Sequence, residues 1–125
     1  MSRKVVSTEK APGAIGPYSQ GICVGDKLFT SGQLPMDPVS GELFTEIKKA
    51  TKQCLENVKA ILEAEGFTMQ DVIKTTVFMK NMDDFVSMNE VYATYFTVNP
   101  PARSAVQVAK LPKDAVVEIE VIASK

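Results

Sequence analysis

The chain has 125 residues, of which 45% are apolar and 23% charged, and a formal net charge of −1. This composition is typical of one globular domain that is long enough to bury a core without disulfides. The 14 basic residues are nearly balanced by 15 acidic ones and are not clustered along the sequence. This distribution argues against a nucleic-acid-binding surface.

The sequence contains no histidine and no tryptophan. The absence of histidine excludes Ser-His-Asp and Cys-His catalysis, histidine metal sites and a histidine acid or base. Chemistry must therefore come from Arg, Glu, Asp, Lys, Tyr, Ser or the backbone. No G-x-G-x-x-G, P-loop or paired C-x-x-C pattern is present, so dinucleotide, P-loop and zinc-ribbon functions lack support.

The beginning of the chain predicts no targeting segment. The first ten residues hold no apolar run and no long apolar stretch follows, so we expect no signal peptide, no membrane span and a cytoplasmic protein. Cys23 and Cys54 are far apart in apolar surroundings and are predicted to be buried, reduced thiols.

The first third of the chain predicts short strands and loops. Val5-Val6 is a candidate strand, and residues 11–21, with two prolines and three glycines around Tyr18, form an irregular loop. Tyr18 is either a packed lid on the core or a functional hydroxyl. Residues 21–24 and 27–32 predict a hairpin around Gly25-Asp26, and a proline-broken loop follows.

The middle of the chain alternates helix and strand. Apolar residues recur at three- and four-residue steps from Glu46 to Glu65 and predict an amphipathic helix that Gly66 ends. Residues 72–79 are β-branched and aromatic and predict a central strand. A second helix is expected from Asn81 to about Phe96, with its acidic residues favourable at the N-terminus.

The last quarter, residues 99–122, predicts two further strands separated by a proline turn. In the final strand one face is uniformly apolar, with Val117, Ile119 and Val121, whereas the other carries Val116, Glu118, Glu120 and Ile122. The order of elements indicates a single α+β domain in which two helices cover one face of a mixed sheet of about six strands. The second face is too apolar for solvent and too charged for a core, so we expect other copies of the chain to cover it.

Arg103 is the first candidate for chemistry. The double proline before it restricts the backbone, and its guanidinium fork suits a planar carboxylate, with each charge-assisted bond contributing roughly 1.5–3 kcal/mol. The alternatives are a surface arginine or an ion pair with Glu118. Glu118 is the candidate that orients water, but spacing alone does not distinguish it from Glu120.

Four blocks of sequence resemble the RidA (YjgF-like) family of reactive imine and enamine deaminases. They are IGPYSQG, TSGQLP, KTTVFMKNMDDF and PPARSAVQVAKLPKDAVVEIE, and together they span almost the whole chain. The resemblance implies a chorismate-mutase-like fold and a homotrimer with clefts between subunits. It also implies hydrolysis of 2-aminoacrylate- and 2-aminocrotonate-type intermediates, released by pyridoxal-phosphate-dependent serine and threonine dehydratases, to 2-keto acids (pyruvate and 2-ketobutyrate) and ammonia, with no cofactor or metal bound.

The resemblance also implies residue roles. Arg103 would clamp the substrate carboxylate, Glu118 would activate water and Tyr18 would lie near the imine nitrogen. Substrate-binding positions would be Ser31, Gly32, Asn89 and Ala105, although Asn89 by itself looks like a solvent-facing helix residue. Ala105 stands where many relatives carry cysteine, and Pro100 where they often carry another residue, so the pocket rim is expected to differ.

Two other functions stay open at this level. A protein of this kind could bind 2-keto acids without catalysis and regulate a partner enzyme. A ribonuclease or translation inhibitor, also ascribed to relatives, is less favoured by the near-neutral charge and the lack of histidine.

Overall fold

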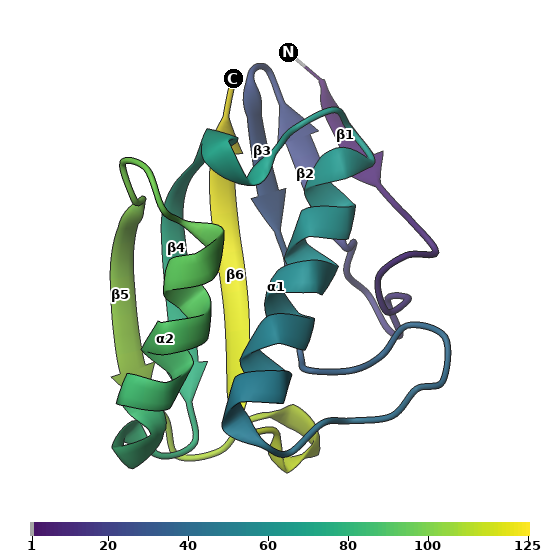
Figure 1. Ribbon diagram of the computed structural model, residues 1–125. Coiled ribbons are helices and arrows are strands. Elements are labelled where there is room, and N and C mark those ends of the chain that lie inside the picture. The colour runs from purple at the N-terminus through teal and green to yellow at the C-terminus, as the bar shows by residue number, and fades with distance from the viewer. Residues whose placement is uncertain (1) are drawn as a thin grey trace.

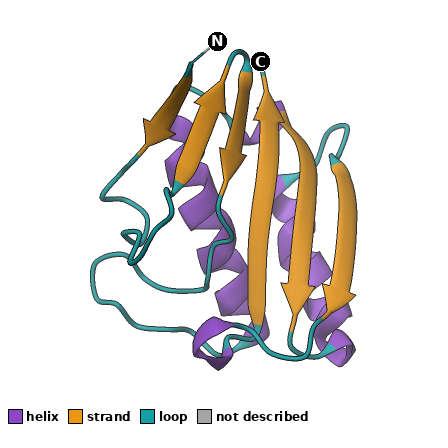
Figure 2. Ribbon diagram, turned by 180° about the vertical axis from the view of Figure 1, so that it is seen from behind, coloured by secondary structure: helices purple, strands orange, loops and turns teal. Residues whose placement is uncertain are grey.

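A computed structural model describes residues 2–125, which form one six-stranded mixed sheet with two α-helices on one face (Figures 1 and 2). The strand order is β1-β2-β3-β6-β4-β5; β4 and β5 are parallel and all other neighbours antiparallel. The elements are β1 (Arg3–Val6), β2 (Gly21–Val24), β3 (Lys27–Thr30), α1 (Ile47–Glu63), β4 (Val72–Met79), α2 (Phe85–Tyr95), β5 (Ala102–Gln107) and β6 (Val117–Ser124), with short 3₁₀ turns at Met69–Asp71, Met82–Asp84 and Pro112–Asp114. The predicted α+β class and helix placement are confirmed.

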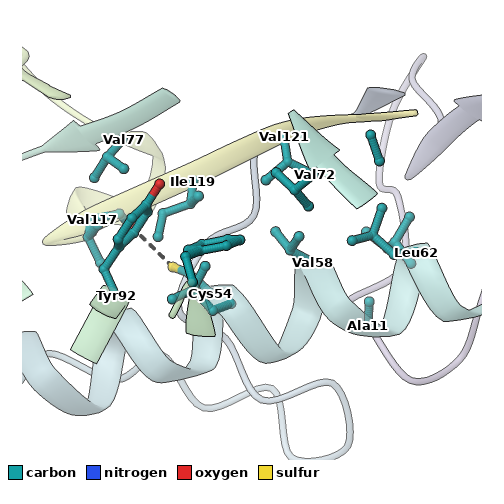
Figure 3. Close-up of a cluster of buried hydrophobic side chains, with 14 of the residues drawn as sticks. Ala11, Cys54, Val58, Leu62, Val72, Val77, Tyr92, Val117, Ile119 and Val121 are labelled. Carbon is teal, nitrogen blue, oxygen red and sulfur yellow. Dashed lines mark hydrogen bonds between the residues drawn. The ribbon is translucent and has the colours of Figure 1, made fainter. Parts of the chain in front are cut away.

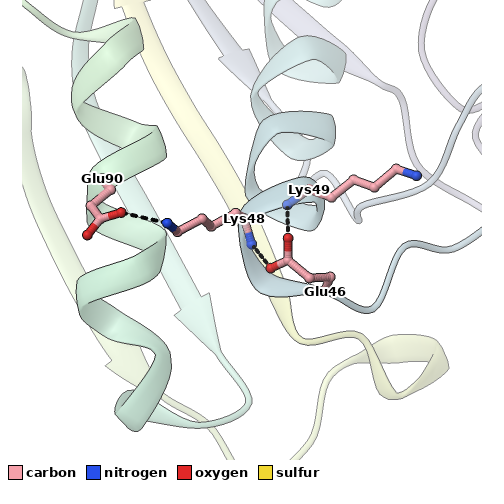
Figure 4. Close-up of polar contacts among 4 residues, drawn as sticks. All are labelled: Glu46, Lys48, Lys49 and Glu90. Atoms are coloured by element: carbon pink, nitrogen blue, oxygen red, sulfur yellow. Dashed lines mark hydrogen bonds and ion pairs between the residues drawn. The ribbon is translucent and has the colours of Figure 1, made fainter.

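The first helix, α1, begins one residue later and ends two residues earlier than predicted. The Glu46 carboxylate caps it by accepting hydrogen bonds from the backbone N–H groups of Lys48 (2.6 Å) and Lys49 (3.3 Å), as Figure 4 shows. Gly66 ends the helix at a φ of 77°, which strains any side chain with a Cβ. The Lys48 ammonium also lies 2.8 Å from Glu90 on α2 and so links the two helices at their exposed side (Figure 4).

The hydrophobic core lies between the helices and the sheet, where α1 and α2 pack against β4 and β6 (Figure 3). Leu55, Val58, Ile61 and Leu62 of the predicted α1 stripe are fully buried. Cys54 is buried and its thiol donates to the Val117 carbonyl at 3.7 Å. The prediction for the other cysteine is wrong: Cys23 is a free thiol but only partly buried, because β2 lies near the edge of the sheet.

The alternation along β6 divides the two faces of the sheet as expected. Val117, Ile119 and Val121 are buried under the helices, while Glu118 and Glu120 lie on the face that no helix covers. Val116 differs from the prediction: it packs against the core because β6 begins only at Val117.

The face without helices remains apolar in part. The strand register places Val5, Phe29 and Val106 on it, and 60%, 42% and 44% of their surfaces are exposed. Figure 2 shows this side of the sheet, with the helices behind it. None of the helices in residues 2–125 has both the length and the apolar composition needed to cross a membrane.

Candidate active site

A cavity of about 520 Å³ opens where the loops before β2 and after β3 meet the start of β6. Four predicted site residues line it: Tyr18, Ser31, Gly32 and Glu118. The loops that enclose it lie on the opposite side of β6 from β5 and α2 (Figure 1). We call these four residues the cavity half-site.

The Glu118 carboxylate lies directly against Gly32. A Cβ added to Gly32 would lie 2.8 Å from the Glu118 Cδ atom, closer than real Cβ contacts allow, and 3.1 Å from its Cγ atom, which is closer than most such contacts. Gly32 is therefore needed for a close approach between its backbone and the carboxylate, rather than for an unusual backbone conformation.

Burial raises the pKa of Glu118 above its ordinary value, and the charge of neighbouring Glu120 raises it further. The cause is physical: the carboxylate loses hydration in the cavity and faces a like charge on the same side of the strand. A carboxyl group whose pKa is raised in this way takes up a proton at a higher pH than an ordinary glutamate, which favours a role in proton transfer.

The Tyr18 loop is tied down by a buried glutamine that the motif analysis did not single out. The Gln20 amide oxygen accepts from the Thr8 N–H at 2.7 Å, and its amide nitrogen donates to the carbonyls of Thr8, Ala11 and Pro12 at 3.0, 3.2 and 2.8 Å. Ser31 also anchors the loop, since its hydroxyl donates a hydrogen bond to the Ser19 carbonyl at 2.5 Å. These bonds present Tyr18, 52% exposed, at the cavity wall.

Two further residues, which were not among the predicted site residues, shape the wall of the cavity. Asn57, buried within α1, donates from its side-chain amide to the carbonyls of Leu34 (3.1 Å) and Met36 (3.0 Å), both residues of the wall. Lys113 lines the cavity from the turn before β6 and has a left-handed φ of 57°. Such a conformation is uncommon for lysine and costs of order 1 kcal/mol.

Arg103 does not line this cavity. It lies on β5 and points toward α2, where its Nη1 group donates to the Asn89 Oδ1 atom at 2.6 Å. Its guanidinium carbon lies 4.7 Å from the Tyr92 ring centre and 5.3 Å from the Phe85 ring centre. Its position on a helix suggested that Asn89 only faces solvent, but its side chain accepts this hydrogen bond from Arg103.

No carboxylate in residues 2–125 forms an ion pair with Arg103. The interpretation of Arg103 as the partner of Glu118 is therefore wrong within one chain. Ala105 lies two residues further along β5 on the same side of the sheet. We call Asn89, Arg103 and Ala105 the arginine half-site.

The strand register shows why the half-sites are separate. Arg103 pairs with Thr75 of β4, and Thr75 pairs with Val121, which faces the helices. Glu118 pairs with Phe78, three residues along β4 from Thr75 and hence on the other face. One copy of the chain therefore does not bring the arginine and the glutamate together.

Comparison with known proteins gives a consistent result. Residues 8–125 match the family described as Endoribonuclease L-PSP. A RutC family protein of Pyrococcus horikoshii is 56% identical over 98% of both chains, and the 2-iminobutanoate/2-iminopropanoate deaminase of Salmonella typhimurium is 50% identical over 96% of both. The crystal structure of Escherichia coli TdcF with bound serine has a TM-score of 0.95 and 48% identity, and the alignment covers 98% of each chain.

The family match covers residues 8–125, a range that contains every residue of both half-sites, and the relatives align over nearly the whole chain. The four sequence blocks predicted the same family. The chain belongs to the RidA (YjgF-like) family, which is also described as the Endoribonuclease L-PSP family.

Proposed function

We propose that this protein hydrolyses 2-iminobutanoate and 2-iminopropanoate, the imine tautomers of 2-aminocrotonate and 2-aminoacrylate, to 2-ketobutyrate and pyruvate with release of ammonia. The observation that carries the proposal is the pair of half-sites. One holds a carboxylate of raised pKa in a cavity, and the other holds an arginine that forms no ion pair with any carboxylate of the described residues, 2–125. The 50% identity to a deaminase with this activity supports it.

The chemistry requires few groups. Protonation of the imine nitrogen makes C2 electrophilic, and water adds to C2 while its proton passes to Glu118. Protonated Glu118 then gives its proton to the nitrogen of the resulting carbinolamine, the C–N bond breaks and ammonia leaves. The C2 hydroxyl returns its proton to Glu118 as it becomes the keto group, and Glu118 releases that proton to solvent. Arg103 would hold the substrate carboxylate through two parallel hydrogen bonds, and Tyr18 would lie beside the nitrogen.

The proposal requires a site shared between copies of the chain. Arg103 of one copy would face the cavity half-site of a neighbour, an arrangement that a closed ring of three copies repeats at each seam. The partly apolar sheet face without helices supports such an assembly, because exposed Val5, Phe29 and Val106 are unfavourable in water. We therefore propose a homotrimer with three equivalent sites.

The substrates are unstable and must be supplied where they are used. We propose that serine and threonine dehydratases dependent on pyridoxal phosphate release them in the cytoplasm. The assay accordingly couples purified threonine dehydratase to this protein and follows the imine together with 2-ketobutyrate and ammonia.

Mixed oligomers test both the chemistry and the sharing of the site. Arg103→Ala and Glu118→Gln, each inactive alone, are coexpressed with different affinity tags, and oligomers that carry both tags are isolated. In a mixed trimer one seam joins an intact arginine to an intact glutamate, so about one third of the wild-type activity should return. If both residues acted within one copy, no activity would return.

A matched control uses Arg103→Ala coexpressed with the Arg103→Ala/Glu118→Gln double variant, since no seam in those oligomers contains the arginine. An active control would remove Arg103 from the mechanism. A wild-type chain that bound 2-ketobutyrate but left imine decay unchanged would favour the non-catalytic, keto-acid-binding function. Salt-dependent RNA cleavage without imine turnover would favour a ribonuclease.

A further inference from the structure

Within residues 2–125 no carboxylate lies within ion-pair distance of Arg103, and neutral side chains hold its guanidinium instead. The guanidinium contacts three side chains of α2, which are one amide and two aromatic rings: Asn89, Phe85 and Tyr92. The bond to Asn89 uses one of the five N–H groups of the guanidinium, so a planar carboxylate could occupy two others.

The Tyr92 side chain is itself held in place by contacts with β4 and with Phe96. Its hydroxyl and the Thr75 hydroxyl of β4 share a hydrogen bond of 2.7 Å in the buried core, and its ring packs on Phe96 with a centroid distance of 4.7 Å. Only 5% of Tyr92 is exposed. The ring therefore has one available orientation, and it presents its face to Arg103.

Neutral partners have a specific consequence for an anion-binding arginine. A carboxylate in place of these groups would orient the guanidinium equally well but would cancel the charge that attracts the ligand. Aromatic faces attract and orient a cation through the ring quadrupole while leaving its net charge at +1. The arrangement therefore combines a fixed direction with an undiminished charge.

We propose that Tyr92 and Phe85 are positioning residues for Arg103: they fix its guanidinium from the α2 side without neutralising the positive charge that attracts a ligand carboxylate. This proposal rests on the proposed function only in taking Arg103 as the group that binds the carboxylate. Neither ring is required to touch the substrate.

The test compares variants of the full-length protein by the Kd for 2-ketobutyrate and, in competition, the Kd for its uncharged amide. Tyr92→Leu and Phe85→Leu each remove one aromatic face, and Tyr92→Phe keeps the ring and loses only the hydroxyl. Tyr95→Leu is the matched control, since Tyr95 lies three residues further along α2 and its hydroxyl donates to Glu56 at 2.6 Å instead.

The proposal predicts a rise in the Kd for 2-ketobutyrate of roughly tenfold in Tyr92→Leu and roughly threefold in Phe85→Leu. The Kd for the amide should stay constant, and Tyr92→Phe should restore most of the lost affinity. Phe85→Leu keeps the test informative if Tyr92→Leu fails to fold, because Phe85 is only partly buried at the start of α2.

If the Leu variants bound 2-ketobutyrate and its amide more weakly by the same factor, the proposal would be overturned, since a structural role does not discriminate by ligand charge. Unchanged Kd values for both ligands in both Leu variants would also overturn it. The imine turnover of the wild type is measured separately. A wild type without turnover whose Leu variants lose affinity for the carboxylate alone would refute the proposed function and uphold the role of the rings.

Discussion

Arg103 and Glu118 point to opposite faces of the same sheet. Arg103 faces α2 from the edge strand β5, whereas Glu118 faces the side of β6 that no helix covers. A rigid sheet offers no side-chain motion that could join them within one copy. The variants below therefore separate effects on the arginine half-site from effects on the cavity half-site.

Gly32→Ala should impair deamination with little loss of stability. The added Cβ would lie 2.8 Å from the Glu118 Cδ atom, so the flexible carboxylate must swing away from its place in the cavity. We expect at least a tenfold fall in kcat/KM, which a displacement of about 1 Å at a catalytic group readily causes. Gly13→Ala is the matched control, because Gly13 lines the same cavity and its Cβ would meet nothing within 4 Å. Equal activity of the two variants would contradict the placement of Glu118.

Asn89→Asp should weaken carboxylate binding while preserving the fold. Aspartate keeps the acceptor 2.6 Å from Arg103 but adds a negative charge that offsets the guanidinium. We expect the Kd for 2-ketobutyrate to rise by about tenfold or more, and the melting temperature to stay constant or increase. Asn81→Asp, which changes the net charge equally at the cap of a 3₁₀ turn, should bind like the wild type. Unchanged binding by Asn89→Asp would show that the charge of Arg103 is unimportant.

Glu118→Gln should stabilise the protein at neutral pH but not in acid. The pKa of Glu118 is raised in the folded state, chiefly by burial, so the folded protein holds this proton more tightly than the unfolded chain does. Stability is therefore lost as the pH rises from the ordinary glutamate range through the raised pKa. The melting temperature of Glu118→Gln relative to wild type should increase across that window and level off above it. Exposed Glu9→Gln controls for the loss of one carboxylate, and an equal gain at all pH values would contradict this account.

Glu120→Gln should move the acidic limb of the pH–rate profile to lower pH. The charge of Glu120 is the second cause of the raised pKa of Glu118, and its removal makes Glu118 easier to ionise. Because the proposed base must be ionised, activity should persist further into the acid range. Measurement of kcat between pH 4 and 8, roughly the range over which carboxyl groups with raised pKa titrate, would show the shift. A shift toward higher pH would contradict the assignment of Glu118 as the base.

Gln20→Leu should destabilise the protein and loosen the Tyr18 loop. The substitution leaves the Thr8 N–H and three carbonyl groups without their buried partner. We expect a loss of about 1–3 kcal/mol in the free energy of unfolding. Urea unfolding measures the loss, and exposed Gln70→Leu is the control. Equal stability of both variants would mean that water replaces the lost bonds.

Local sequence patterns were sufficient to predict most elements of the fold. The β-branched residues 72–79 predicted the bounds of β4, and the apolar spacing with Gly66 predicted α1 to within two residues of its ends. The alternation around Glu118 predicted the two faces of the last strand. These features depend on the period of side chains along one element, which the sequence displays directly.

The pairing of strands and the long-range hydrogen bonds were decided only in the tertiary structure. The register of β5 on β4 places Arg103 against α2, and no local pattern specifies that register. Asn57 and Gln20 likewise look like ordinary polar residues until the fold brings distant backbone carbonyls to them. The sequence therefore supplied the candidate site residues, whereas the packing of distant segments determined that one copy divides them into two half-sites.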